Sequence, residues 1–204
     1  MAKARTTTPI AIALPSAVAK RFPKSLSLRN GEQMTLRLMT RADRDAVVNF
    51  ARSLPPNDLL FLRSNITEPA AVDRWVDNIE AGRSLTILAY AGDALAGYAS
   101  LHLNEADWMR HIAEIRMLTG PAHRGVGLGR ILAGEAYAVG SGLGLKKLSA
   151  QMTLDQGGAR RTFERLGFKA EALLGDWVMS SDGQTRDLLV MAYDLAGLTD
   201  MVDA

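Results

Sequence analysis

The chain has 204 residues, of which 48% are hydrophobic and 23% are charged, as in ordinary globular domains. Its formal net charge of +2 is too small to indicate binding to nucleic acid or to an anionic membrane surface, and no apolar run approaches the roughly 20 residues that span a bilayer. The absence of cysteine excludes disulfides, thiolate metal sites and a cysteine nucleophile, and it fits a cytoplasmic location.

The first elements follow a predicted flexible extension over residues 1–23, which is rich in Ala, Thr, Lys and Pro. A single domain is expected over residues 24–204, without internal repeats or a clear linker. Turn residues at Asn30-Gly31 and Gly92-Asp93 predict two hairpins, and Pro69 is placed to open a helix. In chain order, the first half is expected to contain a hairpin over 25–39, a helix over 40–53, an irregular segment over 57–67, a helix over 69–82 and a hairpin over 84–103.

The second half alternates between strand and helix patterns. Apolar residues recur at helical spacing from Leu128 to Val139, and the glycines of residues 140–142 close that helix. The expected elements are a strand over 112–119, a helix over 128–139, a strand over 146–153, a helix over 159–166, and strands over 172–180 and 186–195 around the turn Asp182-Gly183. This order predicts one mixed α/β domain with a partly antiparallel sheet.

Glycines gather between the strand over 112–119 and the next helix, in the segment Arg124-Gly125-Val126-Gly127-Leu128-Gly129-Arg130. Glycine permits positive φ angles and a close approach of the backbone to a ligand. Unpaired amides at the helix start would then face a site where the helix dipole favours an anion such as a pyrophosphate, and the two arginines add positive charge. A tight turn without a ligand would need the same glycines, so this pattern by itself leaves both interpretations open.

Other phosphate-binding motifs fit the glycine segment poorly. A P-loop needs Gly-Lys-Ser/Thr, a dinucleotide motif needs a glycine where Arg130 stands, and a kinase glycine loop needs companion motifs that the chain lacks. Metal chemistry is not indicated either. The three histidines, His102, His111 and His123, lack the spacing of metal ligands on one helix face, so no bound metal is predicted.

The glycine segment resembles the Gln/Arg-x-x-Gly-x-Gly/Ala signature of the GNAT acetyltransferases, which follows their fourth strand. Two flanking segments are also similar to that family, namely Ala113-Glu114-Ile115 and Phe163-Glu164-Arg165-Leu166-Gly167-Phe168. The resemblance covers Thr35 to Leu195 and implies an α+β-like GNAT fold. Such a fold has a central, mostly antiparallel twisted sheet that is flanked by helices and splayed between its fourth and fifth strands. A weaker similarity links the chain to the acyltransferase part of bacterial protein-lysine acetyltransferases.

The same resemblance implies acetyl-CoA as the cofactor. Its pantetheine arm would hydrogen-bond like an added strand to the end of the strand over 112–119, and its pyrophosphate would bind the amides of the glycine segment. An amide near Leu118 would stabilise the oxyanion. The expected cofactor-binding residues are Met117, Leu118, Thr119, Arg124, Gly125, Val126, Gly127, Leu128, Gly129, Arg130, Gln156 and Phe163.

Glu114 is the candidate general base, because it is an acidic residue inside an otherwise apolar strand, where many members of the family carry their base. A base is useful because an alkyl amine with a pKa of about 10.4 is almost fully protonated at neutral pH. A salt bridge from Glu114 to Arg110 or Arg116 is the structural alternative. His102 and His111 are alternative bases.

Two positions depart from the family pattern. Gln156 stands where Asn is usual, and Phe163 replaces a Tyr that often protonates the leaving thiolate, so Tyr90 and Tyr98 become candidate acids. Two functions therefore stay open. One is an acetyl-CoA-dependent N-acetyltransferase in which a primary amine attacks directly within a ternary complex. The other is a catalytically weak CoA-binding regulatory or interaction module.

The acceptor site is expected around residues 54–64, with Trp108, Arg110 and His111 as candidate lining residues. The acceptor implied by the resemblance is a small-molecule amine, or a lysine or N-terminus of a protein. Neither nucleic acid nor a membrane is an expected partner, and a homodimer is compatible with the resemblance.

Overall fold

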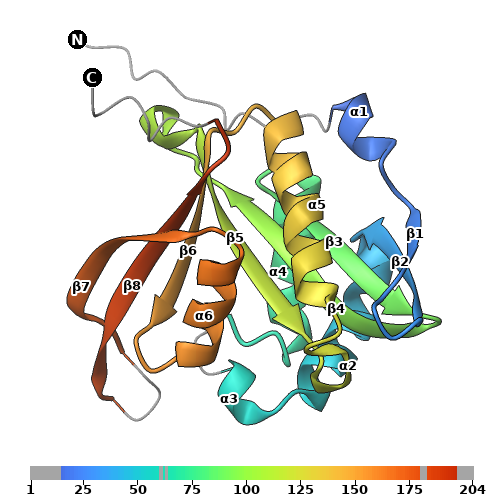
Figure 1. Ribbon diagram of the computed structural model, residues 1–204, viewed down its shortest axis with the longest axis horizontal. Coiled ribbons are helices and arrows are strands. Elements are labelled where there is room, and N and C mark those ends of the chain that lie inside the picture. The colour runs from blue at the N-terminus through green and yellow to red at the C-terminus, as the bar shows by residue number, and fades with distance from the viewer. Residues whose placement is uncertain (1–14, 60–61, 63, 180–182, 197–204) are drawn as a thin grey trace.

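The computed structural model describes residues 15–59, 62, 64–179 and 183–196 (Figure 1). In these residues the strands form one eight-stranded sheet in the order β1-β2-β3-β4-β5-β6-β8-β7. Neighbouring strands are antiparallel except for β5 and β6, which run parallel. The expected fold, a mostly antiparallel sheet flanked by helices, is therefore confirmed.

The strands and helices alternate along the chain much as the residue pattern predicts. The strands are β1 (Lys24–Ser27), β2 (Gln33–Leu38), β3 (Ser84–Ala91), β4 (Ala94–Leu103), β5 (Ile112–Thr119), β6 (Lys147–Thr153), β7 (Lys169–Met179) and β8 (Thr185–Asp194). The α-helices are α1 (Ser16–Ala19), α2 (Arg44–Ser53), α3 (Pro56–Leu59), α4 (Pro69–Glu80), α5 (Leu128–Gly142) and α6 (Gly157–Arg165). Short 3-10 turns are η1 (Arg41–Asp43), η2 (Asp107–Met109) and η3 (Pro121–His123).

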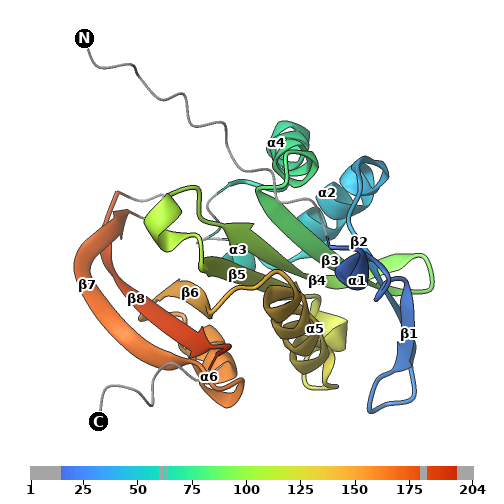
Figure 2. The same cartoon turned by 90° about the horizontal axis from the view of Figure 1, so that it is seen from above.

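Helices cover both faces of the sheet. Figure 2 shows α2 and α4 on one face and α5 and α6 on the other. Alternation along β3 explains this arrangement, since successive side chains of a strand point to opposite faces. Leu85 and Ile87 belong to the apolar cluster under α5, whereas Leu88 and Tyr90 belong to the cluster with α2 and α4.

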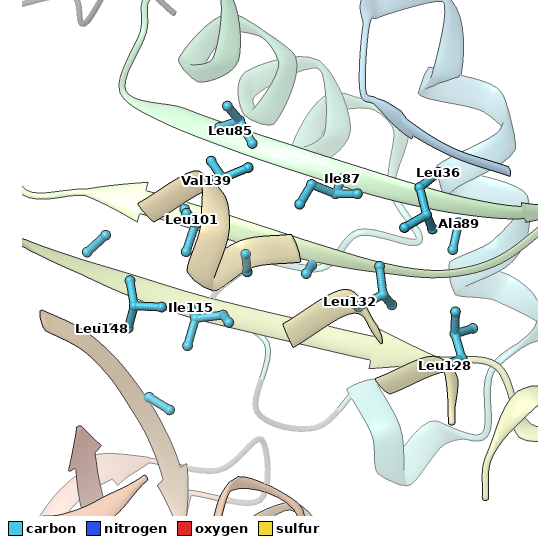
Figure 3. Packing of buried hydrophobic residues seen from close by; sticks show 14 of the residues in the cluster. Leu36, Leu85, Ile87, Ala89, Leu101, Ile115, Leu128, Leu132, Val139 and Leu148 are labelled. Atoms are coloured by element: carbon cyan, nitrogen blue, oxygen red, sulfur yellow. The ribbon is translucent and has the colours of Figure 1, made fainter. Parts of the chain in front are cut away.

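The core against α5 fixes the start of that helix. Leu128 and Leu132 in α5 are fully buried in one cluster with Ile115 of β5 and Leu148 of β6 (Figure 3). Burying each such side chain is worth roughly 1.5–3 kcal/mol. The glycine segment therefore leads into a helix whose first turn is packed against the sheet through Leu128 and Leu132.

The parallel pair β5 and β6 separates after a short contact. The two strands pair only where Ile112–Glu114 meets Lys147–Ser149. Beyond that point β5 continues beside β4 as far as Thr119, and β6 continues beside β8 as far as Thr153. The expected splay is thus found between β5 and β6, which are the family's fourth and fifth strands when the additional strand β1 is not counted.

Several details differ from the sequence prediction. The segment over 57–67 was expected to be irregular, but Pro56 opens the one-turn helix α3. Helix α6 begins at Gly157 rather than at Ala159, with Gln156 as its N-cap. Helix α1 lies within the predicted extension over 1–23, and its Val18 is buried against α5. Asp182 of the predicted turn Asp182-Gly183 lies outside the described residues.

Candidate functional site

Two cavities open where β5 and β6 separate. One has a volume of about 740 Å³ and is lined by residues of α3, β5, β6, α6 and β7, and the other has a volume of about 640 Å³ and includes the glycine segment. They share six lining residues, which are Asp58, Met117, Leu118, Gly158, Ala159 and Phe163. The two cavities therefore meet at the gap in the sheet.

The glycine segment forms a wall of the smaller cavity. Gly125 and Gly127 have φ angles of 77° and 102°, in the left-handed region that favours glycine, and Gly127 is the N-cap of α5. Because the first amides of a helix have no partner within it, this end of α5 presents donors and the positive end of the dipole to the cavity. Such a wall suits an anionic phosphate.

Most of the expected cofactor-binding residues line one or both cavities. They are Met117, Leu118, Thr119, Arg124, Gly125, Gly127, Gly129, Arg130, Gln156 and Phe163. Val126 and Leu128 do not, since Val126 packs against the core cluster and Leu128 is fully buried in it. The Leu128 side chain is thus closed to a ligand, and the Val126 side chain is partly buried, so the backbone is the part of both residues that can contribute to the site.

The Arg124 side chain is engaged by the protein itself. Its Nη2 lies 2.5 Å from Oδ2 of Asp58 in α3, and its Nε donates to the Thr119 carbonyl oxygen at 3.2 Å. The ion pair ties the segment after α2 to the glycine segment. Asp58, which borders both cavities, was an unassigned member of the expected acceptor segment.

Glu114 lies on the wall of the larger cavity. Its Oε1 is 2.8 Å from Nε of Arg116, and the two side chains are 14% and 24% exposed. The salt-bridge partner suggested by the sequence is thus Arg116. His102 lies opposite Glu114 on β4, with its Nε2 3.0 Å from the Ser100 hydroxyl, and lines neither cavity.

Two residues that depart from the family pattern have structural contacts. Gln156 accepts a hydrogen bond from the Thr153 amide at 3.0 Å, which joins the end of β6 to the start of α6. Phe163 packs edge-to-face on Phe168 with a centroid distance of 4.9 Å. Phe163 borders both cavities, so an apolar ring stands where the family's phenol would be.

Of the two candidate tyrosines, only Tyr98 borders a cavity. The Tyr90 hydroxyl instead donates to Asp43 at 3.0 Å, and burial followed by the nearby Asp43 charge raises the pKa of Tyr90 to about 12. Tyr90 as the acid is therefore wrong. Tyr98 lines the larger cavity, and burial raises the pKa of its hydroxyl above the ordinary value. The hydroxyl of Tyr98 stays protonated and can act as a donor.

The expected outer lining is also corrected. Trp108 is 79% exposed, and neither it nor Arg110 or His111 borders either cavity, because η2 carries this connection away from the gap. The larger cavity instead includes Val178 and Met179 at the end of β7. No local sequence pattern indicates these contacts, since they depend on how the β7–β8 hairpin curves beside β6.

The described residues fit a long ligand that is anionic at one end. The smaller cavity is bordered by Arg29, Arg124, Arg130 and Arg165 and by a single acid, Asp58. In the described part of the chain, no three His, Cys, Asp or Glu residues are grouped so as to hold a metal ion. No helix within the same residues is long and apolar enough to cross a membrane.

Comparison with known proteins agrees with this geometry. Residues 49–168 match the family described as the acetyltransferase (GNAT) family. A Bacillus subtilis (strain 168) protein whose name gives it as a phosphinothricin acetyltransferase is 26% identical over 164 residues, which are 80% of this chain and 100% of that protein.

Solved structures share the fold. The yncA protein of Salmonella typhimurium, solved with acetyl-CoA, has a TM-score of 0.68 and 21% identity over 79% of this chain and 94% of its own. Spermidine N-acetyltransferase from Vibrio cholerae, solved with CoA and spermine, has a TM-score of 0.66 and 19% identity over 80% of this chain and 96% of its own.

The chain thus shares the fold of solved acetyltransferases, and the smaller of its two cavities suits an anionic ligand. With more than half of its length matched by the family, the chain belongs to the acetyltransferase (GNAT) family. It is an N-acetyltransferase, and acetyl-CoA is its acetyl donor.

Proposed function

We propose that the chain acetylates a primary amine, which attacks the acetyl carbonyl directly while both substrates are bound. The observation that carries this proposal is the meeting of the two cavities at Leu118 and Phe163. A donor bound along the glycine segment and an acceptor in the larger cavity could meet there without a covalent enzyme intermediate. Cysteine is absent from the chain, so a thiol nucleophile is excluded.

The cofactor-binding role of the residues that border the smaller cavity belongs to this proposal. Acetyl-CoA supplies an activated acetyl group as a thioester. The amides of Gly125–Arg130 would hold its phosphates at the start of α5, as expected for a helix N-terminus. The backbone of β5 beyond Glu114, where pairing with β6 has ended, would hold the pantetheine arm, and an amide near Leu118 would donate to the oxyanion.

Glu114 is proposed as the general base for the amine. Its carboxylate borders the larger cavity, and the ion pair with Arg116 holds it in place. During transfer the amine nitrogen forms a bond to the acetyl carbon, the carbon–sulfur bond breaks, and one amine proton passes to Glu114. The departing thiolate, with an ordinary pKa of about 8.5, needs no strong acid, and the Tyr98 hydroxyl is the candidate hydrogen-bond donor to it.

A small amine is the favoured acceptor. The larger cavity is lined by three acidic residues, Asp58, Glu114 and Asp155, and by one basic residue, Arg116, and this excess of negative charge favours a cationic ligand before its deprotonation. The names of two similar proteins refer to phosphinothricin and to spermidine, which are small amines. A protein lysine or N-terminus is the other acceptor class. The cytoplasmic location expected from the cysteine-free composition stays a prediction.

The alternative function, a catalytically weak CoA-binding module, is favoured by one observation. Phe163 packs on Phe168 and brings no hydroxyl to the place where the two cavities meet. A panel of phosphinothricin, spermidine and a lysine peptide, assayed by thiol release and product mass, separates the two functions. Binding of acetyl-CoA without product from any of these amines would support the module instead of the enzyme.

The proposed role of Glu114 is tested by Glu114→Gln. We expect kcat to fall by about 100-fold or more with little change in the KM for acetyl-CoA, because a positioned base contributes about 10²–10⁴-fold. Glu105→Gln makes the same chemical change at an exposed residue that lies 3.5 Å from Arg83, and it should keep the parent rate. An unchanged kcat in a folded Glu114→Gln variant would remove Glu114 from the mechanism.

A further inference from the structure

Arg29 lies against the glycine segment although it is distant from it in sequence. Its backbone amide donates to the Val126 carbonyl oxygen at 3.3 Å. Its Cγ and Nε both lie 3.7 Å from the point that a Cβ on Gly127 would occupy. The side chain therefore runs over the N-cap of α5 and borders the smaller cavity beside Gly125, Gly127 and Arg130.

The turn that carries Arg29 is held on both sides. Leu28 is buried, and its amide donates to the Glu32 carbonyl oxygen at 2.9 Å. After the turn, Oε1 of Glu32 lies 3.3 Å from Nε2 of His123, which directly precedes the glycine segment. These contacts on both sides of the turn fix the position of Arg29 in the β1–β2 hairpin.

A second anchor ties the same hairpin to α5. Glu135, buried in α5, accepts hydrogen bonds from Nη2 of Arg21 at 2.8 Å and from Nζ of Lys24 at 2.5 Å. Burial would raise the pKa of Glu135, but hydrogen bonds from Lys24 and Arg21 outweigh it and hold the pKa below its usual value. The carboxylate therefore stays ionised and keeps β1 beside the helix whose start lines the cavity.

Of the four arginines that border the cavity, Arg29, Arg130 and Arg165 have no ion pair with another described residue, and it is Arg29 whose side chain lies over the N-cap Gly127. Arg124 is already paired with Asp58. Among the described residues, by contrast, no ion pair or side-chain hydrogen bond involves the Arg29 guanidinium, which is exposed at the rim of the cavity. A guanidinium beside a helix N-terminus is suited to a diphosphate, to which it donates charge-assisted hydrogen bonds.

We propose that Arg29 binds the diphosphate of acetyl-CoA and that the β1–β2 hairpin is a wall of the cofactor site. This inference rests on acetyl-CoA being the donor. It adds a binding residue outside the family match of residues 49–168. It also gives β1 and β2 a role in cofactor binding, since the hairpin that they form holds Arg29 beside the cavity.

Calorimetric titration of Arg29→Gln with CoA and with dephospho-CoA, which lacks the 3′-phosphate, tests the inference. We expect the Kd of both ligands to rise by about tenfold, the typical effect of losing one charge-assisted contact. Arg29→Lys should lose less. Pantetheine, which has no phosphate, should bind the parent protein and Arg29→Gln equally in a competition titration.

Arg74→Gln is the matched control, because it removes the same charge from an exposed position on α4, on the opposite face of the sheet. Its Kd for CoA should equal that of the parent. Unchanged CoA affinity in Arg29→Gln would overturn the proposal, and so would an equal loss with pantetheine. If Arg29→Gln weakened the binding of CoA but not of dephospho-CoA, Arg29 would bind the 3′-phosphate, and the diphosphate assignment would be overturned. Failure of the parent protein to bind CoA would instead remove the cofactor assignment itself.

Discussion

At the scale of single residues, Asp43 both caps the start of η1 and is buried in the protein. The Thr40 amide donates to its Oδ2 at 2.8 Å, and Arg37 and the Tyr90 hydroxyl donate to the same carboxylate. Only 2% of Asp43 is exposed. Burial would raise the pKa of Asp43, but the hydrogen bonds from Arg37, the Thr40 amide and Tyr90 outweigh it and lower the pKa below its usual value.

Asp43→Asn should therefore destabilise the protein by about 1–3 kcal/mol, since several donors lose a charged acceptor. Because the folded pKa is depressed, the stabilisation is present above the unfolded value of about 3.9 and is lost as the pH falls through the folded value. Urea unfolding should show the full difference at pH 7 and a smaller one below about pH 3.9. Asp45→Asn, at a mostly exposed site, is the control. Equal unfolding free energies for the two variants would contradict this role of Asp43.

Some residues of the site could be predicted from the sequence and others could not. Glycines at Gly125 and Gly127 could be identified because a positive φ is a local property that leaves a local signature. The Asp58–Arg124 pair and the contact of Arg29 with Gly127 could not, because they join segments that meet only after the sheet has formed. Glu114 lies between these cases, since its strand was predicted but its partner Arg116 was one of two choices.

At the scale of elements, hydrophobic pattern predicted the central strands well. The bounds of β3, β4 and β5 agree with the expected ones, because each is an apolar run closed by turn residues. Helix α3 was missed, since it has only four residues, of which the first is a proline, and so short a segment carries no periodicity. The outer hairpin of β7 and β8 was placed less accurately because β7 is largely exposed and has register shifts, which blur its alternation.

Helix α5 offers a matched pair of glycines for a stability test. A Cβ at Gly134 would meet no atom within 4 Å, whereas one at Gly142 would lie 2.8 Å from Cγ2 of Val18 in α1. Gly134→Ala should raise the free energy of unfolding by about 0.5–1 kcal/mol, because alanine favours the helix. Gly142→Ala should lower it by about 1 kcal/mol or more, because the buried Val18 side chain, or α1 with it, must shift. Thermal and urea unfolding measure both, and an equal gain at Gly142 would show that α1 does not pack there.

At the scale of the whole molecule, the sheet brings two half-sites together. The β1–β2 hairpin and α5 border the cofactor cavity, and α3 and β7 contribute to the larger one. The described strands from β1 to β8 form one continuous sheet, and the single domain over residues 24–204 stays a prediction. The gap between β5 and β6 joins the half-sites, so the interruption of pairing that weakens the sheet is also where acetyl transfer is proposed.

Gly129 allows the cofactor site to be blocked without disturbing the fold. A Cβ there would meet only Cγ2 of Thr119, at an ordinary contact distance of 3.9 Å. Aspartate in the first turn of a helix is favourable for folding, because it complements the dipole. In Gly129→Asp its carboxylate would stand where a phosphate is expected, and the two anions would repel each other.

The most direct test of this account is a calorimetric titration of acetyl-CoA into the parent protein and Gly129→Asp. We predict binding of one acetyl-CoA per chain with a Kd between about 1 μM and 1 mM, the usual range of substrate affinities, and at least about tenfold weaker binding by the variant. No heat of binding to the parent at millimolar acetyl-CoA, or equal affinity in a folded Gly129→Asp variant, would contradict a cofactor site at the start of α5.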